Sequence, residues 1–111
     1  MTDITTPAFR RLASAEAIKN DSVVPFYLDD SKLRISVARV NDRFYAFDDL
    51  CTCAHTSCPL SGGLFAGTVI MCQCHGSRWD VATGAVINGP ATKALNVYEV
   101  QVVDGSVQLR A

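Results

Sequence analysis

The sequence is short of charge and of long apolar runs, and each shortage excludes a class of protein. Charged residues make up 19% of the 111 residues, and the formal net charge is −1. No run of lysine and arginine stands out, which argues against nucleic acid as the main partner. No apolar stretch approaches the roughly 18 residues that a transmembrane helix needs, so no membrane anchor is expected.

Export signals and common catalytic motifs are also missing. The pair Arg10–Arg11 would suit a twin-arginine signal, but the residues after it are too polar for a signal core, so we expect a cytoplasmic protein. The chain has no glycine-rich phosphate loop and no GxSxG nucleophile motif. Hydrophobic residues reach 49%, which predicts a packed core in one domain, residues 1–111.

β-Rich segments alternate with turn residues along most of the chain. They cover residues 23–28, 33–40, 43–49, 67–72, 77–81, 84–87, 95–103 and 106–110. Asn41–Asp42 and Asp104–Gly105 are two-residue hairpin signals, and Pro25 places its segment at the start or edge of a sheet. Ser14 can cap a helical turn over residues 14–21. Strands at intervals of about ten residues predict an antiparallel all-β sandwich or barrel.

All five cysteines and both histidines lie in two short stretches, residues 50–60 and 71–80. The strand pattern places both stretches in or beside loops. Two loops on one rigid β-scaffold, each with thiol and imidazole side chains, indicate a metal site.

The spacing of these side chains favours one kind of metal centre. Cys53 and His55 stand as Cys-x-His, and Cys72 and His75 stand as Cys-x-x-His. Two thiolates and two imidazoles can hold zinc, but zinc motifs usually pair two cysteines at one end and two histidines at the other. A [2Fe–2S] centre with two cysteines on one iron and two histidines on the other uses such a mixed set. We favour the iron–sulfur centre and keep structural zinc as the alternative.

The sequence resembles the Rieske iron–sulfur proteins from about residue 23 to residue 109. The likeness lies in "FYAFDD", "PLSGGLFAGTVIMC", "HGSRWDVATGAV" and "GPATKALNVYEV". It implies one Rieske-type [2Fe–2S] cluster, with the cysteines on a buried iron and the histidines on an exposed one, held by Cys53, His55, Cys72 and His75. It also implies a cluster-binding subdomain at about residues 48–92, inserted in a β-sheet base, with Gly89–Pro90 covering the cluster.

Two further cysteines, Cys58 and Cys74, resemble a different branch of that family. In the Rieske subunits of respiratory quinol-oxidising complexes, cysteines at these two places form a disulfide, whereas many soluble oxygenase ferredoxins lack both. The resemblance therefore implies a Cys58–Cys74 disulfide, which in the chain-entropy model would stabilise the fold by about 3 kcal/mol. The alternative is two reduced thiols, which a reducing cytoplasm favours.

The same branch suggests roles for residues beside the ligands. A hydroxyl at the place of Ser77 donates to a bridging sulfide there, and Trp79 stands where that branch has a tyrosine that donates to a ligand cysteine. We expect Trp79 to serve mainly as a core residue. The Cys-x-His register selects Cys53 rather than Cys51, which we expect to be a buried or free thiol. Asp48 and Asp49 are expected to form a solvated pair with diverging side chains.

Charge explains the use of two histidines. Two ferric ions, two sulfides and two thiolates sum to zero, whereas four thiolates would leave a charge of −2. Adding an electron to a neutral centre is easier, so Rieske potentials lie at about −150 to +300 mV, against about −400 mV for plant-type ferredoxins. Hydrogen bonds to cluster sulfur raise the potential further. We expect a midpoint above that of soluble oxygenase ferredoxins and below the full respiratory type.

These features predict a soluble one-electron carrier rather than an enzyme. Once both histidines are ligands, no histidine remains as a catalytic base, and the cluster has no vacant coordination position. We expect the protein to carry electrons from a reductase to an oxygenase or a similar terminal redox enzyme, through small contacts at the edge formed by His55, His75 and Pro90. One alternative is a small Rieske subunit held tightly in a larger redox enzyme. A second alternative is a structural zinc domain or a redox sensor.

Overall fold

The computed structural model describes residues 9–29, 32–50, 59–74, 76–89 and 91–110. Several residues singled out by the sequence lie outside this described part: Cys51, Cys53, His55, Cys58, His75 and Pro90. Of the four predicted cluster ligands, the described part therefore contains Cys72.

The described residues form ten strands and two short 3-10 turns, which confirms the all-β prediction. In chain order they are β1 (Arg10–Ser14), η1 (Ala15–Ala17), β2 (Ser22–Leu28), β3 (Leu33–Val40), β4 (Arg43–Asp48), η2 (Leu60–Gly62), β5 (Leu64–Ala66), β6 (Val69–Met71), β7 (Arg78–Asp80), β8 (Val86–Asn88), β9 (Val97–Val103) and β10 (Ser106–Arg110). Within the described residues, no helix has the length and apolar character to span a membrane.

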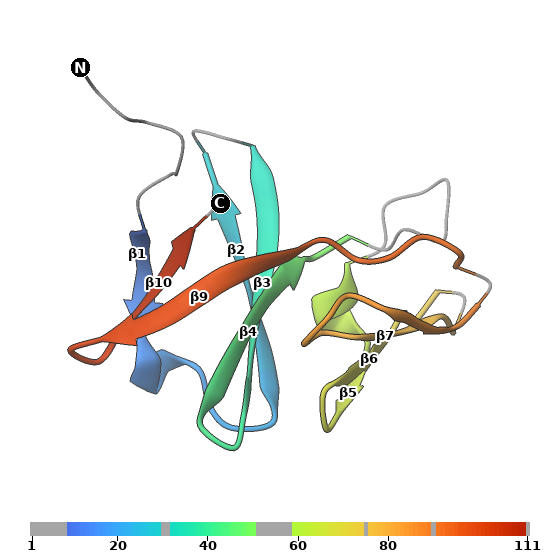
Figure 1. The fold of residues 1–111 in the computed structure, drawn as a ribbon, viewed down its shortest axis with the longest axis horizontal. Helices are drawn as coiled ribbons and strands as arrows, with labels where there is room; N and C mark the ends of the chain where they lie inside the picture. The colour runs from blue at the N-terminus through green and yellow to red at the C-terminus, as the bar shows by residue number, and fades with distance from the viewer. Residues whose placement is uncertain (1–8, 30–31, 51–58, 75, 90, 111) are drawn as a thin grey trace.

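The strands make two antiparallel sheets. The base sheet has six strands in the order β1-β10-β9-β4-β3-β2, and the small sheet has four in the order β5-β6-β7-β8. Figure 1 shows the small sheet beside the base sheet, toward one end of the long axis of the molecule. Strand β2, which contains Pro25, is an edge strand of the base sheet, as predicted from the missing N–H of proline.

The two predicted hairpin turns are present because their residues accept a left-handed backbone. Asn41 (φ 51°) and Asp42 (φ 64°) join β3 to β4, and Asp104 (φ 50°) and Gly105 (φ 74°) join β9 to β10. Positive φ at both central residues is the geometry of the turn whose twist matches the flanking strands. These turns fix the register of both hairpins.

Strand β3 buries residues on both of its faces. Ile35 and Val37 are fully buried, and so are Ser36 and Ala38 on the opposite face. The reason is that each face of the base sheet is covered at this point. Ile35 and Val37 belong to one core cluster, whereas Ala38 packs in a second cluster with residues of the small sheet such as Ile70.

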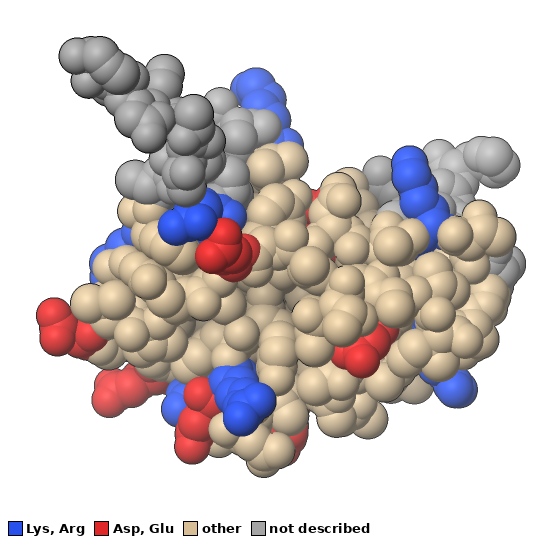
Figure 2. All heavy atoms as spheres, viewed as in Figure 1, with Lys and Arg blue, Asp and Glu red and all other residues tan. Residues whose placement is uncertain are grey.

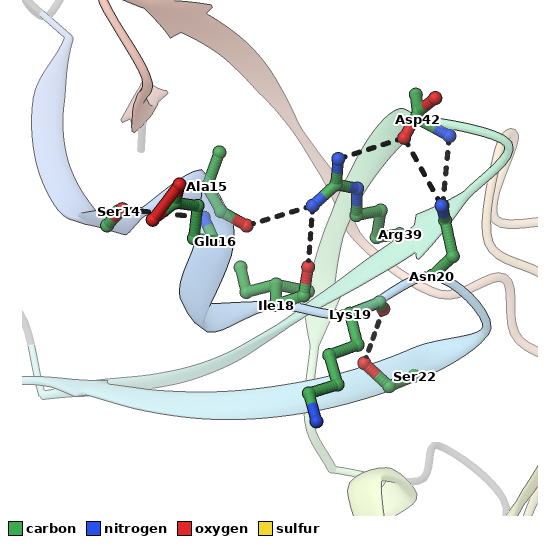
Figure 3. Close-up of polar contacts among 9 residues, drawn as sticks. All are labelled: Ser14, Ala15, Glu16, Ile18, Lys19, Asn20, Ser22, Arg39 and Asp42. Carbon is green, nitrogen blue, oxygen red and sulfur yellow. Dashed lines mark hydrogen bonds and ion pairs between the residues drawn. The ribbon is translucent and has the colours of Figure 1, made fainter.

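Arg39 braces the turn that precedes β2 (Figure 3). Its guanidinium donates to the carbonyls of Ala15 (3.1 Å) and Ile18 (2.9 Å) and pairs with Asp42 (2.9 Å). A hydrogen bond from Asn20, and then the hydrogen bond and charge of Arg39, hold the pKa of Asp42 below its usual value. The predicted helical turn over residues 14–21 is shorter than expected, and its 3-10 turn spans Ala15–Ala17.

Charged side chains are scattered over the face drawn in Figure 2. Lysine and arginine side chains stand singly or in small groups among acidic ones, and no large area of one sign forms on this face. This agrees with the near-neutral net charge of −1.

Candidate metal centre

Cys72 lies directly after β6, at the start of the second predicted ligand loop. Its side chain is buried, and its residue is 0% exposed. Its backbone N–H donates to the carbonyl of Ser77 (2.8 Å), and the N–H of Gly76 donates to the carbonyl of Cys72 (2.9 Å). Gly76 has φ +79°, which a glycine adopts without strain. A tight backbone loop therefore presents the buried thiol.

Ser77 connects this loop to the segment that follows β8. Its buried hydroxyl oxygen accepts a hydrogen bond from the backbone N–H of Ala91 (2.9 Å). The side-chain amide of Asn88 donates to the carbonyls of Gly76 (3.2 Å) and Gly89 (2.9 Å). A hydroxyl that accepts one hydrogen bond still has its own proton to donate. Ser77 is thus held in place, and its hydroxyl proton can donate a further hydrogen bond.

Trp79 lies in the core. It is fully buried with Phe47, Leu60 and Ile70, which supports its expected packing role. Its indole Nε1–H donates to the backbone carbonyl of Lys93 (3.1 Å). Because the indole has a single donor, this bond leaves none for a ligand cysteine.

The expectation of a solvated aspartate pair is wrong for Asp49. The side chains of Asp48 and Asp49 diverge as expected, but Asp49 is fully buried and forms an ion pair with Arg34. Asp48 is partly exposed and accepts a hydrogen bond from the hydroxyl of Tyr98. Burial, then the hydrogen bond to Asp48 and the charge of Asp48, raise the pKa of Tyr98 well above its usual value. Sequence adjacency alone gave no signal of this burial.

The described chain on either side of the first predicted ligand loop comes together at one point. Leu50 and Pro59 form an isolated antiparallel bridge, and the N–H of Leu60 donates to the carbonyl of Asp49 (2.5 Å). Residues 51–58, which include the predicted ligands Cys53 and His55, lie between Leu50 and Pro59 in the sequence and outside the described part.

Cys74 is disulfide-bonded in the structure. Its partner lies outside the described residues, so the pairing with Cys58 stays a prediction. Cys74 is two residues from Cys72, and the disulfide therefore attaches to the loop that carries the buried thiol.

The described residues fit an iron–sulfur cluster. Cys72 offers a buried sulfur, and thiolate sulfur is the ligand such clusters use. Ser77 offers a hydroxyl donor in the same loop, of the kind that hydrogen-bonds cluster sulfur. Comparison with known proteins agrees: the model of the Rieske [2Fe–2S] domain matches residues 9–99.

The chain belongs to the Rieske [2Fe–2S] family. One relative of this Rieske protein, "Ferredoxin CarAc" of Metapseudomonas resinovorans, is 44% identical over 73 residues, which is 66% of either chain. Another, the anthranilate 1,2-dioxygenase ferredoxin subunit of Burkholderia cepacia, is 29% identical over 98% of this chain and 97% of its own length. The match to Ferredoxin CarAc thus spans just under two thirds of the length of that protein.

Solved structures of ferredoxins match nearly the whole of this Rieske protein. The ferredoxin of Sphingomonas yanoikuyae B1 superimposes with a TM-score of 0.83 at 29% identity, over 94% of this chain and 99% of its own. A chain from the complex of reduced oxygenase and oxidized ferredoxin in carbazole 1,9a-dioxygenase gives 0.81 at 32% identity, over 92% of both chains. The family shows that the protein carries one Rieske-type [2Fe–2S] cluster.

Proposed function

We propose that this Rieske protein carries single electrons from a reductase to a terminal oxygenase. The observation that supports this most directly is the near-full-length likeness to a chain of an oxygenase–ferredoxin complex. Several relatives are named as ferredoxin components of dioxygenase systems, including that of naphthalene 1,2-dioxygenase in Pseudomonas putida. Both the reductase and the oxygenase are proposed partners.

The proposed ligands divide between the two loops. Cys53 and Cys72 would hold one iron and His55 and His75 the other, and the two histidines with Pro90 would supply the contacts to the partner. When bound, the cluster accepts and releases one electron. Cys72 keeps its sulfur away from water, and the bond from Cys72 N–H to the Ser77 carbonyl holds the loop in shape. With the small sheet, both loops form the proposed cluster-binding subdomain at about residues 48–92.

We also propose a cytoplasmic location and a Cys58–Cys74 disulfide that ties the two loops together. The disulfide state of Cys74 supports the proposed disulfide. A disulfide in the reducing cytoplasm must have a low reduction potential to persist. Mass spectrometry of protein alkylated directly in lysed cells would test the disulfide.

Electron delivery to an oxygenase tests the proposed function. The protein is reduced without oxygen and mixed in a stopped-flow instrument with the oxidised terminal oxygenase encoded nearest to its gene. We expect reoxidation of the cluster at a rate that rises with oxygenase concentration, because each electron transfer requires a transient contact between the two proteins. A reduced protein that keeps its electron beside that oxygenase would contradict the proposal.

The disulfide of Cys74 favours one second candidate, a small subunit held tightly in a larger redox enzyme. In that case a large partner would co-purify with the protein through gel filtration at physiological salt. A free carrier would elute alone.

The hydroxyl of Ser77 should raise the midpoint potential. Ser77→Ala removes the hydroxyl that the N–H of Ala91 holds in place. Without this donor, the negative charge of the reduced cluster is stabilised less. We expect the midpoint to fall by tens of millivolts, measured by voltammetry, with Ser77→Thr close to the unmodified protein. An unchanged midpoint in Ser77→Ala would show that this hydroxyl does not reach the cluster.

A further inference from the structure

The carboxylate of Asp49 is buried and receives hydrogen bonds on both oxygens. Oδ1 accepts from the hydroxyl of Ser36 (2.7 Å) and from the backbone N–H of Ser61 (2.7 Å). Oδ2 accepts from the hydroxyl of Ser61 (3.2 Å) and pairs with Nε of Arg34. Each carboxylate oxygen therefore has two hydrogen-bond or ion-pair partners, and the side chain has a fixed orientation.

These donors come from both sides of the first ligand loop. Arg34 and Ser36 lie on β3 of the base sheet, whereas Ser61 lies in η2, beyond the loop. The backbone of Asp49 repeats the pattern, since its N–H donates to the carbonyl of Arg34 (2.9 Å) and its carbonyl accepts from Leu60. Asp49 therefore joins the chain that enters the loop, the chain that leaves it, and the base sheet.

Asp49 is also close in sequence to a proposed cluster ligand. Cys53 is four residues along the chain, and a fully extended segment of that length spans at most about 14 Å. At this largest separation, two unit charges at an effective dielectric constant of about 20 would change an equilibrium by about sevenfold, and a shorter separation would give a larger change, on the order of tenfold. Asp49 is 0% exposed, so water screens this interaction little.

We infer that Asp49 is a positioning residue for the cluster: it fixes the root of the first ligand loop on the base sheet, and its buried negative charge holds the midpoint potential down. This inference rests on the proposed ligation by Cys53 and His55. A fixed negative charge opposes the electron that the cluster accepts, so removal of this charge favours the reduced state.

Asp49→Asn separates charge from shape. Asparagine has nearly the same size but no charge, and it has one acceptor oxygen where Asp49 uses two. If the oxygen keeps Ser36 and the N–H of Ser61, the amide nitrogen faces Nε–H of Arg34, and two donors then oppose each other. We expect the reduction equilibrium to shift by about tenfold toward the reduced cluster, which is about 59 mV upward for one electron.

Two further variants make the test specific. Arg34→Met leaves the negative charge of Asp49 without its ion-pair partner, so its midpoint should move in the opposite direction, downward. Asp48→Asn removes a neighbouring charge that is more exposed and bonds to Tyr98 on β9 instead, so its shift should be less than half that of Asp49→Asn. The midpoints are measured by voltammetry, and the EPR spectrum of each variant shows whether the cluster is intact.

The outcomes are distinct. Equal midpoints for Asp49→Asn and the unmodified protein, or equal shifts for Asp49→Asn and Asp48→Asn, would overturn the inference. If Asp49→Asn does not retain its cluster, Arg34→Met decides, because an unchanged or higher midpoint in that variant would overturn it. An unmodified protein without a Rieske EPR signal would instead be a failure of the proposed ligation.

Discussion

Cys72→Ser is expected to give a folded protein that lacks its cluster and its red-brown colour. The thiol of Cys72 is buried, so water cannot replace it as a ligand. A serine hydroxyl at this position is a poor ligand for iron. The backbone hydrogen bonds of Cys72 with Ser77 and Gly76 do not involve the sulfur, so the loop can still form. Visible absorbance and iron per chain would show the loss, and far-UV circular dichroism would show the retained strands.

The matched control lies in the first loop, where two cysteines stand one residue apart. Cys53→Ser should lose the cluster as completely as Cys72→Ser, whereas Cys51→Ser should keep the full absorbance and iron content. The difference follows from the Cys-x-His register, which includes Cys53 and leaves Cys51 outside. A bleached Cys51→Ser with a coloured Cys53→Ser would mean that the register is wrong by two residues.

Trp79→Ala is expected to destabilise the protein by about 3 to 5 kcal/mol, the range for removing a large buried aromatic side chain. Trp79 is 0% exposed and belongs to the cluster of side chains that joins the two sheets, with Phe47 of β4 and Ile70 of β6. The cavity left by this substitution would therefore lie between the small sheet and the base sheet. Urea unfolding of the cluster-loaded protein, followed by circular dichroism, measures the change.

Trp79→Phe separates the packing of the ring from its hydrogen bond. Phenylalanine fills most of the space but leaves the carbonyl of Lys93 without the indole donor, at a cost of about 1 to 3 kcal/mol. The midpoint potential should stay unchanged, because the indole N–H is already used by that carbonyl. A clear fall in the midpoint of Trp79→Phe would show that the indole donates to the cluster after all.

Local sequence patterns predicted the hairpins and the strand class well. Positive φ at Asn41, Asp42, Asp104 and Gly105 is a property of these residue types, so the turns could be identified without tertiary information. The burial of both faces of β3 could not be predicted in this way. It depends on the small sheet packing over Ala38 and on the contact of Ser36 with Asp49, and residues distant in sequence from β3 form both.

The site shows the same division between local and tertiary information. The spacing of cysteines and histidines favoured an iron–sulfur cluster over zinc, because each loop offers one thiol and one imidazole, and the resemblance to the Rieske family identified the kind of cluster. The role of Asp49 was missed because its partners Arg34 and Ser36 lie 15 and 13 residues away and reach it only through the pairing of β3 with β4. The hydrogen bond from Trp79 to Lys93 is likewise a tertiary contact across 14 residues.

The central claim is a [2Fe–2S] cluster with sulfur ligands on one iron and two histidine nitrogens on the other. Pulsed EPR of the reduced protein, labelled with ¹⁵N only in its two histidines, tests it directly. The account predicts two distinct nitrogen couplings, both sensitive to the label, and the loss of the cluster signal in Cys72→Ser. A purified protein that contains zinc and no iron, or a reduced cluster without any histidine coupling, would contradict it.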